Sequence, residues 1–249
     1  MKPTSFSLLP ILRVVLLASL LPLSTTINAE PGNEGEVAVL TRFEVKKGHL
    51  HKIRRLIAKY VKRANKSGDN IMAEAFYEQD STSVLWIIER WSNRAAFDKS
   101  RAGKKFRLFQ LLSSSKLVQL PTSIYVKDLE PVSREQWRRK PAKDDQPITI
   151  MLFVDSQPGT EKSFQTIYHT AMPQFRSEPG VINYQLSQLN SDPAQFVTYE
   201  KFRNEDAFQY HLQFPPIQPV IDYLNTSIKK QPFQLGLHRL VEFAPLKRE

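Results

Sequence analysis

Hydrophobic and polar positions along this chain follow a series of patterns that occurs twice. In the first half, alternating apolar residues over 37–45 predict a strand. Apolar residues at helical spacing over 50–61 then predict a helix, which Ser67-Gly68-Asp69-Asn70 ends. The elements predicted after this helix are strands over 71–79 and 83–91, short helices within 93–112, and a last strand over 117–128.

The second half repeats this order of elements. A strand is predicted over 148–155, and an apolar stripe over 164–175 predicts one helix face. Strands over 181–189 and 195–203, helices over 205–214 and 217–229, and a strand over 235–243 complete the series.

One register relates the two halves. Leu85-Trp86-Ile87-Ile88-Glu89-Arg90-Trp91 and Phe196-Val197-Thr198-Tyr199-Glu200-Lys201-Phe202 place an acidic residue at the same point of an apolar strand, with an offset of 200 − 89 = 111 residues. The glycines before the two long helices, Gly48 and Gly159, have the same offset, 159 − 48 = 111. A repeat of this length, present twice, predicts two similar domains that pack on each other.

The element order β-α-β-β-α-β predicts a ferredoxin-like α+β fold for each half. We call residues 36–130 module one, 131–146 the linker and 147–246 module two. The third strand of module one is apolar on both faces, because residues 85, 87 and 91 alternate with 84, 86 and 88. Helices cover only one face of such a sheet, so the other face needs a second cover. We therefore predict that the two sheets pack face to face as an intramolecular pseudo-dimer, a dimeric α/β barrel made by one chain.

Residues 1–29 have the layout of a secretory signal peptide: an early positive charge, an apolar run of ten over 14–23, and a small-residue end at Ala29. The alternative is an uncleaved anchor, although the run is short for a membrane span. The chain has no cysteine, which excludes disulfides and thiolate chemistry. These features predict an exported bacterial protein, periplasmic or secreted.

The formal net charge is +10. The excess lies mainly in the first helix and in the linker, which suggests either solvated faces or weak contact with an anionic membrane surface. We predict no nucleic-acid partner, because no aromatic RNA-binding motif occurs on the third strand. We also predict no metal site, because no histidine pair has metal-ligand spacing.

Module two has four local motifs in a recognisable order: Pro158-Gly159-Thr160-Glu161, Glu178-Pro179-Gly180, Tyr199-Glu200-Lys201-Phe202, and His211 on a short helix. In this order they resemble the antibiotic biosynthesis monooxygenase family. Module one resembles a degraded copy, since it has Ser100 where module two has His211, 211 − 111 = 100.

The resemblance implies oxygenation of a quinol-like or polyphenolic molecule by dioxygen, with neither flavin nor metal, so no cofactor is expected. Such chemistry needs a proton acceptor and a dry, apolar cavity. It implies His211 as the catalytic base. The alternative for this residue is a capping or buried structural histidine at a helix end. Haem degradation, another activity in the family, is disfavoured because module one lacks a histidine over 97–112.

The remaining candidates are aromatic or acidic. Glu89 and Glu200 are interpreted as structural anchors, the alternative for each being a carboxylate with a raised pKa. The candidate substrate-binding residues, for which core packing is the alternative, are Tyr168, Tyr184, Tyr199, Phe202 and Phe208.

Two functions remain open from the sequence. One is an exported, cofactor-independent monooxygenase with its site near His211. The other is a non-catalytic binding protein of the cell envelope that holds an apolar ligand or a protein partner in the barrel cavity. The sequence leaves open whether the protein is an enzyme.

Overall fold

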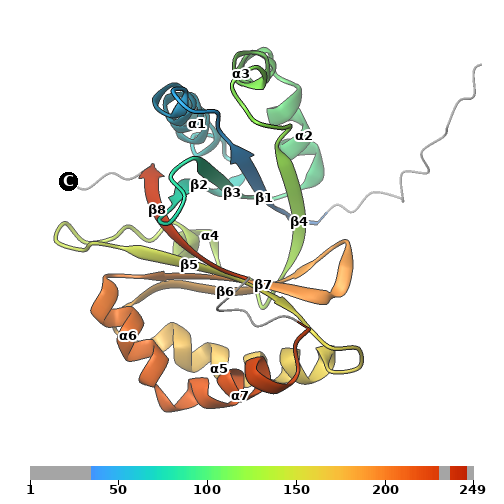
Figure 1. Ribbon diagram of the computed structural model, residues 1–249, viewed down its shortest axis with the longest axis vertical. Helices are drawn as coiled ribbons and strands as arrows, with labels where there is room; N and C mark the ends of the chain where they lie inside the picture. The colour runs from blue at the N-terminus through green and yellow to red at the C-terminus, as the bar shows by residue number, and fades with distance from the viewer. Residues whose placement is uncertain (1–34, 230–235, 246–249) are drawn as a thin grey trace, which may run out of the picture. The chain divides into compact units, whose positions relative to one another are not determined.

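The computed structural model describes residues 35–229 and 236–245, and these residues form a closed barrel of strands with helices outside it (Figure 1). Module one supplies β1 (Val37–Glu44), α1 (Leu50–Ala64), β2 (Asn70–Glu78), β3 (Val84–Trp91), α2 (Arg94–Ala102), α3 (Lys104–Ser114) and β4 (Thr122–Leu129). The linker contains α4 (Arg134–Trp137). Module two supplies β5 (Ile148–Asp155), α5 (Glu161–Ser177), β6 (Val181–Leu189), β7 (Asp192–Phe202), α6 (Glu205–Gln213), a 3-10 turn η1 (Pro215–Ile217), α7 (Gln218–Thr226) and β8 (Leu237–Ala244).

The two ferredoxin-like sheets have the same strand order and join edge to edge. Around the barrel the order is β1-β3-β2-β8-β5-β7-β6-β4, so module one contributes β4-β1-β3-β2 and module two β8-β5-β7-β6. The joins are antiparallel pairs, β2 with β8 and β4 with β6. This closure confirms the predicted pseudo-dimeric barrel.

Three apolar cores explain why both faces of the strands are hydrophobic. One lies between the module one sheet and α1–α3, and one between the module two sheet and α5–α7. The third fills the barrel itself, where side chains such as Trp86, Met151 and Tyr199 meet. Figure 1 shows the two helical layers on opposite sides of the strands.

Two differences from the sequence prediction concern module one and the linker. The last strand of module one begins at Thr122 and not at residue 117, because Pro121 has no N–H for the ladder and Leu117 forms only an isolated bridge to Val45. In the linker, Trp137 of α4 is 2% exposed and belongs to the barrel core. The linker therefore contributes to the interior of the barrel.

Two linker arginines that the charge pattern assigned to solvent or a membrane surface have structural partners. Arg138 donates to the carbonyl oxygens of Asn70 at 2.6 Å and Ile71 at 2.7 Å, and Arg134 donates to that of Gly68 at 2.6 Å. These contacts fix the linker to the start of β2.

The predicted signal peptide lies outside the described residues. Among the residues that are described, no helix is both long and apolar enough to cross a bilayer.

Candidate functional site

His211 lies on α6 and is buried against the module two sheet. The helix begins after Asn204, whose side chain accepts a hydrogen bond from the Ala207 N–H at 2.9 Å, an N-cap that Asn93 repeats in module one. His211 is 1% exposed, and its Nδ1 lies 2.7 Å from Oε1 of Glu178. The candidate base thus has a buried carboxylate partner that can orient its ring.

Glu178 reaches His211 because of the turn at the end of α5. The helix stops at Ser177, and Pro179 comes directly after Glu178. At Gly180, an added Cβ would lie 2.3 Å from the Cβ of Ala207, so only glycine lets the turn approach α6 this closely. The second oxygen of Glu178, Oε2, is buried with no hydrogen-bond partner among the described residues.

Aromatic rings surround His211. Its ring centroid lies 4.8 Å from Phe175, 5.2 Å from Phe202 and 5.3 Å from Tyr184, and Phe208 packs on Phe202 at 5.4 Å. The structure therefore brings together three of the predicted substrate-binding residues, Tyr184, Phe202 and Phe208, with the predicted base. Their roles in binding stay predictions.

Glu200 lies in the same core and is 5% exposed. Its Oε1 accepts hydrogen bonds from the Tyr184 hydroxyl at 3.0 Å and the Thr198 hydroxyl at 2.7 Å. Burial raises the pKa of Glu200, and the neighbouring His211 opposes this shift. No lysine or arginine is hydrogen-bonded to Glu200 among the residues of the described ranges.

Tyr168 connects this core to a cavity. Burial, followed by the charge of Glu200, raises the pKa of both Tyr168 and Tyr184, and the two hydroxyls also interact with each other. The Tyr168 side chain lines a cavity of about 450 Å³ beside α5, together with Met172, Leu186 and His169. Cavities of this size hold small organic ligands.

Glu89, the equivalent carboxylate in module one, has a different environment. It is 0% exposed, accepts hydrogen bonds from Tyr60 at 2.6 Å and Trp91 at 3.2 Å, and forms an ion pair with Arg101. The guanidinium compensates the buried negative charge. Module one therefore has the geometry of a structural anchor at this position.

Tyr199 lies on the opposite face of the sheet from the other candidates. It points into the barrel, where its ring meets Trp137 at 5.6 Å and its hydroxyl donates to Glu74. Successive side chains of a strand face opposite sides, so Tyr199 and Phe202 could not share a pocket. The same alternation could have separated them at the sequence level.

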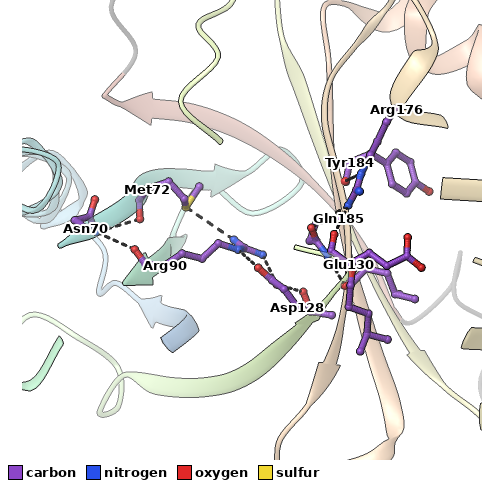
Figure 2. Close-up of polar contacts among 11 residues, drawn as sticks. Asn70, Met72, Arg90, Asp128, Glu130, Arg176, Tyr184 and Gln185 are labelled. Atoms are coloured by element: carbon purple, nitrogen blue, oxygen red, sulfur yellow. Dashed lines mark hydrogen bonds and ion pairs between the residues drawn. The ribbon is translucent and has the colours of Figure 1, made fainter. Parts of the chain in front are cut away.

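The charged groups inside the barrel were not predicted from the sequence. Lys201, 1% exposed, donates to Glu74 at 2.9 Å and Glu242 at 2.6 Å. Arg90 pairs with Asp128 at 2.5 Å and 2.9 Å (Figure 2). Asp128 also accepts a hydrogen bond from the Ser187 hydroxyl of module two at 2.6 Å. The sequence signal that could have identified them is a charged residue at an inward position of an otherwise apolar strand. Charged side chains are rarely buried unless they are paired.

The other histidines have no shared site. His49 and His51 are exposed at the start of α1, His169 pairs with Glu130 at the surface, and His238 lies 3.1 Å from Glu78. Among the described residues, no group of three or more histidine and acidic side chains could hold a metal ion.

A closed barrel of two ferredoxin-like modules defines the dimeric α/β-barrel class. Comparison with known families gives a narrower result: the sequence pattern of the antibiotic biosynthesis monooxygenase family matches residues 36–111 and 147–221. These two matches span more than half of the chain, and the chain belongs to this family.

Solved structures with a similar fold include two named as putative monooxygenases. The one from Lactobacillus acidophilus superimposes with a TM-score of 0.69 at 14% identity, over 84% of this chain and 94% of the other. The one from Fusobacterium nucleatum gives 0.71 at 14% identity, over 84% and 93%. An anthrone oxidase-like protein gives 0.55 at 11% identity, over 85% and 92%.

A sequence relative from Synechocystis sp. is named only as an uncharacterized protein. It is 24% identical over 98 residues, which are 39% of this chain and 66% of that protein.

Proposed function

We propose that this protein oxidises a small phenolic or quinol-like molecule with dioxygen, and that the reaction takes place in module two, between its sheet and helices. The observation that carries the proposal is the difference between the two modules. Glu89 is neutralised by Arg101, whereas the equivalent Glu200 has a raised pKa, and its hydrogen bonds from side chains of the described residues come from the hydroxyls of Tyr184 and Thr198. A buried carboxylate with a raised pKa is a usable proton acceptor near neutral pH.

A substrate in the cavity beside Tyr168 would be joined to that carboxylate through two phenols. The raised pKa values of Tyr168 and Tyr184 keep both protonated at neutral pH, so they pass a proton on and do not store charge. The proton then reaches Glu200, beside which His211 is held by Glu178. Within this proposal His211 is the base that takes the proton from Glu200. The imidazolium formed in this way then stabilises the Glu200 carboxylate.

The redox step balances without another reactant. The deprotonated substrate gives one electron to dioxygen, and the resulting superoxide and substrate radical combine at a ring carbon. The peroxide anion takes back the proton held by the base, and the hydroperoxide then loses water. The ring CH₂ of an anthrone, or of the keto tautomer of a hydroquinone, and O₂ thus become C=O and H₂O. Tyr168, Met172 and Leu186 form the apolar part of the cavity wall against which the substrate ring would lie.

Oxygen uptake by the purified protein with a panel of anthrones and hydroquinones tests the proposal. We expect uptake that falls at least tenfold in His211→Gln and in Glu200→Gln, in line with loss of general-base catalysis. His51→Gln, at an exposed position, is the matched control and should retain full activity. Equal uptake in all four proteins would contradict the assignment of the base.

A second candidate function has its own observation. Phe175, Tyr184 and Phe202 pack around His211, and no cavity described above is lined by it. A binding protein that holds an aromatic molecule beside Tyr168 without turnover fits this packing. Saturable binding of an anthrone with no oxygen uptake would select this function.

A further inference from the structure

A second cavity opens on the other face of the module two sheet, at one mouth of the barrel. We call it the linker pocket, because residues 137–141 of the linker form one of its walls. Its volume is about 330 Å³, and its other walls come from the end of α1, from β2, and from Lys201 of β7 and Glu242 of β8. His211 and Glu200 lie behind the sheet, in a different core.

The inner end of the linker pocket is a hydrogen-bonded charge cluster. Lys201 Nζ lies 2.9 Å from Glu74 and 2.6 Å from Glu242, and Glu74 also accepts from the Tyr199 hydroxyl. The two carboxylates raise the pKa of Lys201 against the effect of burial, which lowers it and is the larger single influence. The lysine therefore stays charged and neutralises much of the acidic charge at this end.

Apolar side chains form the middle of the pocket. Trp137 and Met72 are both 2% exposed, and Pro141 and Pro245 lie nearer the surface. The Trp137 ring is held in place by the Arg90 guanidinium, 3.8 Å from the ring centroid. A fixed indole and a methionine are suitable walls for a flat aromatic ring.

The mouth of the pocket is basic. Lys62, Lys66, Arg139 and Lys140 are exposed there, and none of them pairs with a carboxylate within residues 35–229 and 236–245. Arg138 is different, because its guanidinium is occupied by backbone carbonyls. Four unpaired cations around an apolar cavity attract an anion and favour its orientation with the charge outward.

We propose that the linker pocket binds a small aromatic anion, with its ring against Trp137 and its carboxylate, sulfonate or phosphate among the mouth lysines. The volume suits one or two fused rings. This site is separate from the proposed oxidation site, because it lies inside the barrel and shares no residue with the Tyr168 cavity.

Titration of the full chain with 2-naphthoate, followed by tryptophan fluorescence, tests the proposal, because Trp137 forms a wall of the pocket. We expect saturable quenching, weaker binding of the neutral methyl ester, and loss of affinity with added salt. The double variant Lys66→Glu/Lys140→Glu should bind naphthoate about tenfold more weakly, from the reversal of two charges near the anion.

The matched control is Lys52→Glu/Lys59→Glu, which makes the same charge change at exposed positions of α1 that do not line the pocket. It should bind like the wild type. Equal affinities in the two double variants, or no quenching of the wild type, would overturn the proposal.

Circular dichroism shows whether the Lys66→Glu/Lys140→Glu protein is folded. If it is unfolded, Lys140→Gln alone should still weaken binding about threefold, and an unchanged affinity of this single variant would overturn the proposal. Oxygen uptake is a separate readout, so failure here leaves the proposed oxidation untouched.

Discussion

At the scale of single residues, the two repeated carboxylates show how one position can have different chemistry in two copies of a fold. Arg101 forms an ion pair with Glu89 and lies near the rings of Phe106, Phe97 and Tyr60. Arg101→Met replaces the guanidinium with an apolar side chain that can still pack on these rings. It leaves Glu89 as an unpaired buried charge. We expect the free energy of unfolding in urea to fall by about 3 kcal/mol.

The double variant Glu89→Gln/Arg101→Met checks the reason for this loss. With no charge left uncompensated, it should recover part of the stability lost in the single variant. A double variant that is less stable than Arg101→Met would contradict the interpretation of Glu89 as a charge-paired anchor.

Glu200 predicts a pH dependence of stability. Its pKa in the folded protein is raised above the ordinary 4.5, with burial as the main cause. The stability contributed by its protonated form is complete below about pH 4.5 and is lost as the pH rises through the folded pKa. Glu200→Gln removes this loss, so the variant should gain stability relative to the wild type between pH 4.5 and pH 8, measured by urea unfolding at each pH.

Glu205 is a control of opposite sign for this experiment. Its hydrogen bond from Gln209 lowers its pKa below 4.5, so its stabilising contribution is present above that pH and is lost as the pH falls through the folded pKa. Glu205→Gln should therefore lose stability relative to the wild type as the pH rises through 4.5. The same pH trend in both variants would show that Glu200 does not titrate as proposed.

At the scale of elements, the turn between α5 and β6 determines where α6 lies. Gly180→Ala would place a methyl group 2.3 Å from the Cβ of Ala207 and push α6 away from the turn. Overpacking of this kind costs about 1–3 kcal/mol. We expect a lower melting temperature together with reduced activity or ligand binding, because α6 carries His211 and Phe208.

Gly68→Ala is the matched control for this substitution, since nothing lies within 4 Å of the added Cβ and its backbone is not left-handed. A similar loss in both variants would mean that the contact with Ala207 does not position α6.

The elements themselves were largely predictable from the sequence, and the reasons are specific. The apolar spacing from Phe164 to Phe175 became the buried face of α5, and the two-sided apolar pattern of residues 84–91 became a strand buried on both faces. By contrast, α4 is four residues long, too short for a periodic pattern, so the burial of Trp137 had no local signal. The Glu178–His211 contact spans 33 residues and depends on tertiary packing.

At the scale of the whole barrel, the pairing of sheets followed from the sequence but the seams did not. Strands that are apolar on both faces require a cover on each face, and this requirement holds whichever strand edges of the two sheets pair. The pairs β2·β8 and β4·β6 depend on register, and contacts between residues far apart in the sequence support each seam. Ser187 donates to Asp128 across β4·β6, and Lys201 binds both Glu74 of β2 and Glu242 of β8. The position of the linker pocket follows from the same closure, because its walls come from both modules and the linker.

Closure also predicts that the two modules unfold together. All three tryptophans, Trp86, Trp91 and Trp137, lie in module one or the linker, whereas far-ultraviolet circular dichroism reports on both modules. Because the barrel core mixes residues of both halves, the fluorescence and dichroism transitions in urea should coincide.

Asp128→Ala removes the partner of buried Arg90 at one seam. It should lower the free energy of unfolding by about 3–5 kcal/mol, with both signals shifted equally. Asp98→Ala, which breaks an exposed pair with Arg94, should change it by less than about 0.5 kcal/mol. Two separate transitions in the wild type would show that the modules are independent domains, and the barrel interior would then lose its role in joining them.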